Sequence, residues 1–128
     1  MKSKKDLAWS REKSRRNRVA YTDVLKSRGV RDRGYMLCTD GIYQEVLGGR
    51  AFEVRAANDL GKKANLRDHL GPVDLLMVSL AEMIAAERIE GEGCHGNEAC
   101  LAVSRLCARA IVEGINSARM PIPRLRSV

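Results

Sequence analysis

Residues 72–118 read PVDLLMVSLAEMIAAERIEGEGCHGNEACLAVSRLCARAIVEGINSA, and this stretch decides the fold class. Its apolar side chains recur at steps of three and four residues, which is the period of an α-helix. Pro72 suits the first turn of a helix, and Gly91 and Gly93 are expected to end it. We therefore predict two long helices, the second beginning at Asn97 as its capping residue and running to the end of the stretch.

The joint between these two helices is short, so we predict that they lie antiparallel as a helical hairpin. Such a hairpin leaves apolar surface uncovered, and a second copy of the chain is its simplest cover, which favours an oligomeric helical bundle. The alternative is that the first 60 residues fold back and complete a monomeric core. The residues expected in the oligomer and core are Leu76, Leu80, Ile84, Leu101, Leu106 and Ile111.

Shorter helical patterns precede the long pair. A helix is expected from about Ser10 to Ser27, with Gly29 as its terminator and a connection over residues 30–37 that is either a loop or a short extended segment. The apolar side of this helix is expected to contain Val19, Tyr21, Val24, Leu25 and Trp9.

A second short helix is predicted after Thr39 or Asp40, either of which can cap it, and it should stop at Gly48. A third is predicted around Phe52, ending near Gly61, followed by a structured linker. The whole chain is therefore expected to be all-α.

The charge divides the chain into unequal parts. Residues 1–34 contain twelve Lys and Arg against four Asp and Glu, whereas the remaining residues hold eleven against twelve. We therefore predict a basic N-terminal arm over 1–34, a helical domain over 35–120 and a flexible tail over 121–128. A cationic arm favours an acidic partner. The arm residues expected to bind it are Arg11, Arg15, Arg16 and Arg18.

A nucleic acid is the alternative partner for a basic chain, because neutralising phosphates releases counterions. The arm would then act together with basic residues of the helical domain. Those residues are Arg50, Arg55, Lys62, Lys63 and Arg67.

The cysteines do not favour a metal site or a disulfide framework. Cys94, His95, Cys100 and Cys107 lack the paired spacing of common structural zinc sites. Cys100 and Cys107 share one helix face and are expected to be buried, reduced thiols. No stretch is long and apolar enough to span a membrane, and no apolar signal segment follows the basic start, so we expect a soluble, cytoplasmic protein.

The sequence contains no convincing combination of catalytic residues. His69 with Asp68 and Ser79 could suggest a nucleophile and its base, but no glycine elbow presents the serine. His69 is expected instead to bond a backbone carbonyl near the start of the Pro72 helix. Glu82 and Glu87 lack the Glu-x-x-His partner of di-iron bundles. We predict a protein without catalytic residues, metal or cofactor.

Three segments resemble one family. They are TDGIYQEVLGG at 39–49, NLRDHL at 65–70 and LAEMIAAERI at 80–89. Together, over about residues 39–116, they are similar to the helical region of phage antirepressor-type proteins, some of them associated with BRO and KilA-type domains. The most specific piece of the resemblance consists of Asn65, Leu66, Arg67, Asp68 and His69.

The resemblance implies a regulator from a phage or prophage. Such a protein binds a repressor and removes it from operator DNA. The chain has the basic arm where longer relatives carry a complete BRO or KilA-type domain, so the helical protein-binding region is the part that carries over. The resemblance thus implies a repressor or other regulatory protein as partner.

Overall fold

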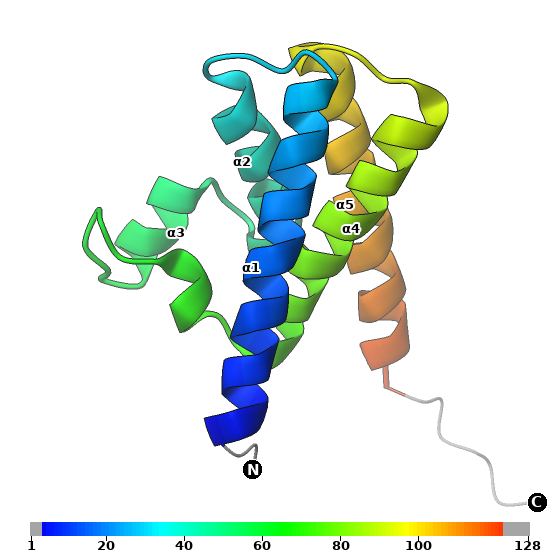
Figure 1. The fold of residues 1–128 in the computed structure, drawn as a ribbon. Helices are drawn as coiled ribbons and strands as arrows, with labels where there is room; N and C mark the ends of the chain where they lie inside the picture. Colours follow the sequence, from blue (N-terminus) through cyan, green and yellow to red (C-terminus); the bar gives the residue numbers. More distant parts are fainter. Residues whose placement is uncertain (1–3, 122–128) are drawn as a thin grey trace, which may run out of the picture.

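The computed structural model describes residues 4–121, with the side chains of residues 11–121. Within this range all regular structure is helical and no strand is present, so the predicted all-α class is confirmed. The helices are α1 (Lys4–Ser27), α2 (Gly34–Leu47), α3 (Ala51–Ala57), the 3-10 helix η1 (Leu66–His69), α4 (Pro72–Glu92) and α5 (Asn97–Arg119) (Figure 1).

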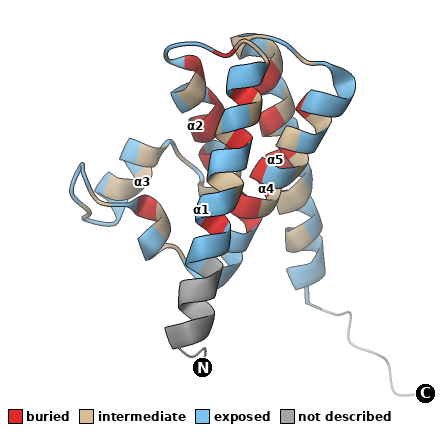
Figure 2. Cartoon of the chain, in the orientation of Figure 1, coloured by how far each residue is buried: buried red, intermediate tan, exposed pale blue. Residues whose placement is uncertain are grey.

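Four of the helices form the body of the molecule, and α3 and η1 lie to one side of it (Figure 1). The helix α1 packs along α4, α2 packs along α5, and α4 and α5 pack on each other. Buried residues, red in Figure 2, follow the faces where these helices meet. The core is built from Tyr21, Leu25, Val30, Cys38, Ile42, Tyr43, Leu66, Val78, Ala81, Ala85, Ile89, Cys100, Cys107 and Ala108.

This arrangement covers much of the apolar surface of α4 and α5 from within the same chain. The helices α1 and α2 supply the cover that we expected from a second copy, as in the alternative in which the first 60 residues fold back. Tyr21 and Leu25 of the expected arm are fully buried among core residues of α4 and α5. The second half of α1 is therefore part of the core.

The turn after α1 shows why Gly29 stands there. Its φ of 77° is the left-handed conformation that glycine adopts without strain, as expected for a helix terminator. A Cβ at Gly29 would also lie 2.4 Å from the His95 ring. The Val30 N–H then donates to the carbonyl of Leu25, 3.0 Å away, and the Val30 side chain enters the core.

The start of α2 differs from the prediction. The helix begins at Gly34, five residues before the expected Thr39, so Gly34 to Leu37 are helical and not a loop. Gly34 is buried, and a Cβ there would lie 2.3 Å from the side-chain oxygen of Asn97. Close packing against α5, which no local pattern encodes, therefore determines where α2 starts. Its predicted end at Gly48 is confirmed by a φ of 81°.

The ends of α1, α3 and α4 also differ from the expected bounds. The first helix begins before Ser10, and Trp9 lies outside the residues whose side chains are described. The helix α3 ends at Ala57 and not near Gly61. Gly91 lies inside α4, which ends at Glu92, and Gly93 follows it in the left-handed conformation, with a φ of 67°. The predicted placement of Pro72 in its first turn is confirmed.

Asn97 begins α5, as predicted, but it does not cap the helix. Gly96 is the residue before the first turn, and the Asn97 side chain binds the backbone of Arg31 instead. Its Oδ1 accepts from the Arg31 N–H at 2.9 Å, and its Nδ2 donates to the Arg31 carbonyl at 3.2 Å. Asn97 thus ties the connection between α1 and α2 to the start of α5.

Three expected core residues lie at the surface. Val19 is exposed, and Leu76 and Leu106 are 63% and 50% exposed. The reason for Leu76 is that α4 packs against both α1 and α5, so its buried face is shifted toward Leu75 and Val78. The other four expected oligomer and core residues are half-buried: Leu80, Ile84, Leu101 and Ile111.

No helix between residues 4 and 121 combines the length and the apolar character needed to cross a bilayer.

Candidate functional site

A buried cluster of charged side chains lies where α1, α2, η1 and α4 meet. The carboxylate of Glu82, on α4, is fully buried. Arg67 binds both of its oxygens, with 2.9 Å between Nη1 and Oε1. Arg18 of α1 adds a contact of 3.4 Å to Oε2, and its Nη1 also donates to Thr39 Oγ1 at 2.6 Å. Paired and hydrogen-bonded in this way, a carboxylate can be buried without water.

Arg67 joins the linker to three helices. Burial alone would lower the pKa of Arg67, but the hydrogen bonds and the charge of Glu82 raise it, so Arg67 stays charged. The same guanidinium donates to Ser14 Oγ of α1 at 2.9 Å and to the Tyr43 hydroxyl of α2 at 3.2 Å. The cluster therefore fixes the position of η1 against the helix bundle.

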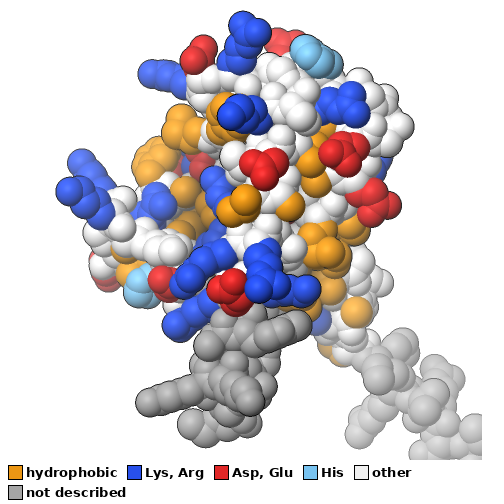
Figure 3. Space-filling view, in the orientation of Figure 1, with side chains coloured by type: hydrophobic (Ala, Val, Ile, Leu, Met, Phe, Trp, Pro, Cys, Tyr) orange, Lys and Arg blue, Asp and Glu red, His pale blue; other side chains and the backbone are white. Residues whose placement is uncertain are grey.

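Two grooves lie on either side of α1, and Arg67 lines both of them. Figure 3 shows Lys and Arg side chains gathered over the lower part of α1, with hydrophobic side chains beside them. We name the groove between α1, α2 and α3 the basic-aromatic groove, and the groove between α1 and α4 the leucine groove.

The basic-aromatic groove runs between α1, α2 and α3 and has a volume of about 700 Å³. It is defined by Arg15 and Arg18 of α1, Tyr35 and Met36 of α2, and Phe52 and Arg55 of α3.

The groove carries a net positive charge. Its lining includes four arginines and one acidic residue, Asp40, and two of those arginines, Arg18 and Arg67, contact the buried carboxylate of Glu82. Asp40 is nearly buried, and its Oδ1 accepts the Ala51 N–H at 3.0 Å. We predicted that Asp40 or Thr39 caps α2, but both lie inside that helix, and Asp40 caps the first turn of α3. The acid therefore holds one wall of the groove in place.

Large apolar side chains are exposed at the mouth of the same groove. Phe52 is 58% exposed and Met36 is 54% exposed, and Val19 lies beside them. The guanidinium of Arg50 stands 4.6 Å from the centre of the Phe52 ring, a cation–π distance. The groove thus combines arginines with accessible aromatic and methionine side chains.

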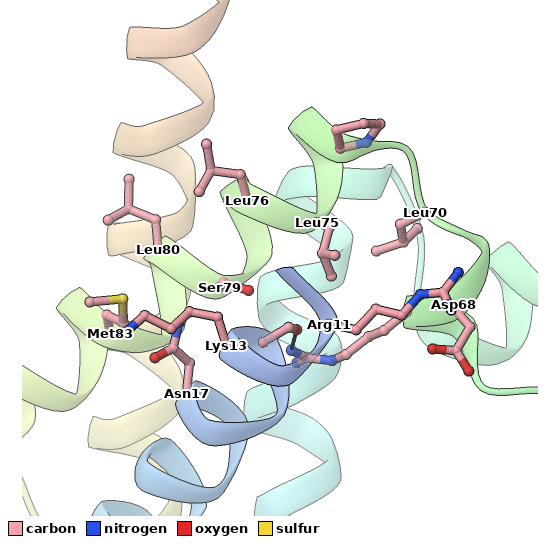
Figure 4. A pocket seen from close by; sticks show the side chains of 13 residues that line it. Arg11, Lys13, Asn17, Asp68, Leu70, Leu75, Leu76, Ser79, Leu80 and Met83 are labelled. Carbon is pink, nitrogen blue, oxygen red and sulfur yellow. Dashed lines mark hydrogen bonds between the residues drawn. The ribbon is translucent and has the colours of Figure 1, made fainter. Parts of the chain in front are cut away.

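The leucine groove lies between α1 and the first half of α4 and has a volume of about 400 Å³. Its apolar wall is defined by Leu70, Leu75, Leu76, Leu80 and Met83, with Arg11 and Lys13 of α1 opposite. Figure 4 shows Lys13 next to Met83 at one end of the groove, and Arg11 with Asp68 and Leu70 toward the other.

The expected arm residues are divided by this geometry. Arg15 and Arg18 line the basic-aromatic groove, and Arg11 lines the leucine groove. Arg16 points elsewhere and forms an exposed ion pair with Glu12 at 3.3 Å. The structure therefore does not gather the four arginines at one site.

The alternative nucleic-acid contacts are not equally available to phosphates. Arg67 is engaged with buried Glu82 and its side chain is only 12% exposed, which leaves little of it accessible to a phosphate. Arg50 pairs with Glu53 at 3.1 Å, and Arg55 Nε donates to the Ala64 carbonyl at 3.0 Å. The remaining two, Lys62 and Lys63, are exposed in the loop after α3.

The segment that carries the family resemblance has a mainly structural role here. Asn65 Oδ1 accepts the Arg67 N–H at 3.1 Å and so caps η1. Asp68 and His69 are exposed. Among the described residues the His69 ring has no hydrogen bond, so the expected bond to a carbonyl near Pro72 is not formed. Ser79 lines the leucine groove and His69 a different hollow, next to Gly71.

The thiols behave as buried apolar groups. Cys100 and Cys107 are buried and form no disulfide, as predicted, and burial raises the pKa of both. Cys38 is also buried, which raises the pKa of its thiol from 9.0 to about 11. Within residues 11–121 no three His, Cys, Asp or Glu side chains are close enough together to hold a metal ion.

Sequence reasoning missed the pairing of Arg67 with Glu82. A signal was present, because Glu82 stands between Val78 and Ala85 at helical spacing, on the side of α4 that is buried. An acidic residue inside an apolar stripe requires a cation or a hydrogen-bond partner. What the sequence does not give is which of the many arginines supplies it. Glu87, the other candidate carboxylate, is exposed.

The chain matches no family model, and no similar curated protein was found.

Proposed function

We propose that this protein is an antirepressor-like regulator, a non-catalytic helical protein that binds a repressor and keeps it from operator DNA. The observation that carries the proposal is the composition of the basic-aromatic groove. Arg, Met and aromatic residues are the types enriched in protein interfaces, and eight of the groove's fourteen lining residues are of these types. The choice of a repressor as partner rests on the resemblance of residues 39–116 to phage antirepressor-type proteins.

The charge of the groove indicates the chemistry of the bound segment. Arg15, Arg18 and Arg55 face the groove, and its one acid, Asp40, is occupied as a helix cap. An acidic segment carrying apolar side chains fits both the arginines and the exposed Phe52 and Met36. A basic DNA-reading face would be repelled. The groove therefore favours an acidic helix or loop of the repressor, outside its DNA-binding surface.

A nucleic acid is the second candidate partner. The fold brings Tyr35 and Phe52 beside Arg15 and Arg55, although these residues do not alternate in the sequence. Single-stranded nucleic acids bind to grooves that combine cations with aromatic stacking surfaces. The exposed aliphatic and thioether groups of Val19 and Met36 fit a polypeptide better, which is why we place this candidate second.

Self-association and location complete the proposal. Leu106 is an exposed leucine on α5 outside both grooves, and it is a suitable contact for a second copy in an oligomeric bundle. A cytoplasmic location suits four free thiols, because that compartment keeps cysteines reduced.

The test is release of a repressor from its operator. A helix-turn-helix regulator that co-purifies with the chain is bound to labelled operator DNA, and the chain is titrated in while fluorescence anisotropy is followed. We expect the operator to be released by the parent chain. Arg15→Glu combined with Arg55→Glu should abolish release. Arg119→Glu, which reverses an exposed charge outside the groove, should leave it unchanged.

Two results would contradict the proposal. One is tight binding of the chain itself to nucleic acid, weakening steeply with salt, which supports the second candidate. The other is release that persists in the double charge reversal, which would place the contact outside the basic-aromatic groove.

A further inference from the structure

The leucine groove has the features of a ligand site that the proposed function does not use. Its walls are mostly apolar, and its volume of about 400 Å³ falls in the range of small-molecule sites. A few polar groups converge on it, including the nearly buried hydroxyls of Ser14 and Ser79. A mostly apolar cleft with a few placed polar groups is the usual form of such a site.

The apolar side chains form a continuous track along α4. Leu76, Leu80 and Met83 follow one another at helical spacing, and Leu76 and Met83 are 63% and 50% exposed. From Leu76 to Met83 the helix rises by about 10 Å at 1.5 Å per residue. Leu75 and Leu70 extend the track toward the start of α4. A narrow apolar track of this length fits an alkyl chain.

Positive charge accompanies the track on the side of α1. Arg11 and Lys13 line the groove from α1, and Asp68 is its only acidic residue. Figure 4 places Lys13 at the Met83 end and Arg11 at the Leu70 end, so a cation lies near each end of the apolar wall. Because Asp68 shares the Leu70 end with Arg11, an anionic head group is favoured most at the Met83 end, where a cationic one is disfavoured.

We propose that the leucine groove binds an anionic amphiphile, a molecule with one alkyl chain and one anionic head group. The chain lies against Leu76, Leu80 and Met83, and the head group meets Arg11 or Lys13. This chemistry occurs in a free alkyl carboxylate and in an anionic lipid of a membrane. The structure favours the free molecule, because the track is recessed between two helices.

The test uses the whole chain and two probes of equal chain length. Dodecanoate and dodecyltrimethylammonium are titrated separately by calorimetry, below their micelle concentrations, while circular dichroism checks that the helices persist. We expect dodecanoate to bind and the cation to bind at least about tenfold more weakly. Decanoate should bind about tenfold more weakly than dodecanoate, because methylenes leave the apolar wall.

A matched pair of variants locates the site. Met83 and Met120 are 50% and 68% exposed, but only Met83 lines the groove. Met83→Gln should weaken dodecanoate binding about tenfold, and Met120→Gln should leave it unchanged. Arg11→Gln should reduce the preference for the anion over the cation.

Other outcomes would overturn the proposal. Equal binding of the two probes, or equal weakening by Met83→Gln and Met120→Gln, indicates non-specific surfactant binding. Binding to phosphatidylglycerol vesicles without binding to dodecanoate indicates a membrane surface. A dimer that light scattering finds converted to monomer by Met83→Gln indicates an interface between copies. None of these results bears on repressor release, which is assigned to the other groove.

Discussion

The two grooves share a wall, α1, and one side chain, Arg67, yet their chemistry differs. The basic-aromatic groove presents arginines with Phe52 and Met36, and the leucine groove presents aliphatic side chains with cations near its ends. The difference arises because α1 packs on α4 along the leucine groove, whereas α2 and α3 form the opposite wall of the basic-aromatic groove. One basic helix therefore lines two grooves, and the neighbouring helices determine the chemistry of each.

The largest effect should come from the residue on which both grooves depend. Glu82→Ala leaves Arg67 and Arg18 without their buried counter-charge and should lower the free energy of unfolding by about 3–5 kcal/mol. Urea denaturation measures this change. Glu87→Ala, on the exposed side of the same helix, is the control and should change stability by less than about 0.5 kcal/mol. Equal effects of the two substitutions would show that the ion cluster does not hold the grooves together.

Alkaline pH should lower the free energy of unfolding, because a thiol and a phenol are buried in the core behind both grooves. Burial raises the pKa of Cys38 from 9.0 to about 11 and also raises the pKa of Tyr21. The folded state therefore keeps protons that the unfolded chain has already released. The free energy of unfolding should be constant below about pH 9 and fall as the pH rises toward 11, as urea denaturation would show. Cys38→Val should remove part of this slope, and an unchanged slope would exclude that thiol as a cause.

Asp40→Ala should have a smaller effect on stability and should affect binding at only one of the two grooves. Asp40→Ala removes the cap at Ala51 and should cost about 1 kcal/mol of stability. Because α3 carries Phe52 and Arg55, the loss should weaken repressor binding and leave dodecanoate binding unchanged. Parallel titrations of the variant with both partners make this comparison. Asp23→Ala, an exposed acid on α1, is the control.

Salt should distinguish the grooves without any substitution. Raising the ionic strength from about 0.01 M to about 0.15 M shortens the Debye length from about 30 Å to about 8 Å. The proposed binding of a repressor, which would use several arginines, should weaken more than the proposed binding of dodecanoate, which would depend mainly on apolar contact. Titrations at the two salt concentrations test this difference, and equal salt dependence would contradict the assigned chemistry.

The smallest effect on stability is expected for Leu76→Ser. Leu76 is mostly exposed, so the free energy of unfolding should change by no more than about 0.5 kcal/mol. The same substitution should still weaken dodecanoate binding, because Leu76 is part of the apolar track. Thermal unfolding and calorimetry on one sample test both statements. A large loss of stability would mean that Leu76 is a core residue, as its periodicity suggested.

The helices were predictable where local chemistry is strong. Pro72 at the start of α4, Gly29 after α1 and Gly48 after α2 mark boundaries that short-range backbone preferences determine. Boundaries set by distant contacts were missed, as at Gly34, whose packing against Asn97 permits α2 to begin early. Of the candidate site, sequence reasoning found the arginines of α1 but not their division between two grooves.

The sequence by itself determined the all-α class, the two long helices and the positive charge of the first 34 residues, because periodicity, turn residues and composition are local properties. Only the tertiary structure decided that Arg67 pairs with Glu82, that Asp40 caps α3 and that Leu76 is exposed. These outcomes depend on which helix faces which. That choice minimises the free energy of the whole packed chain, and no single segment contains it.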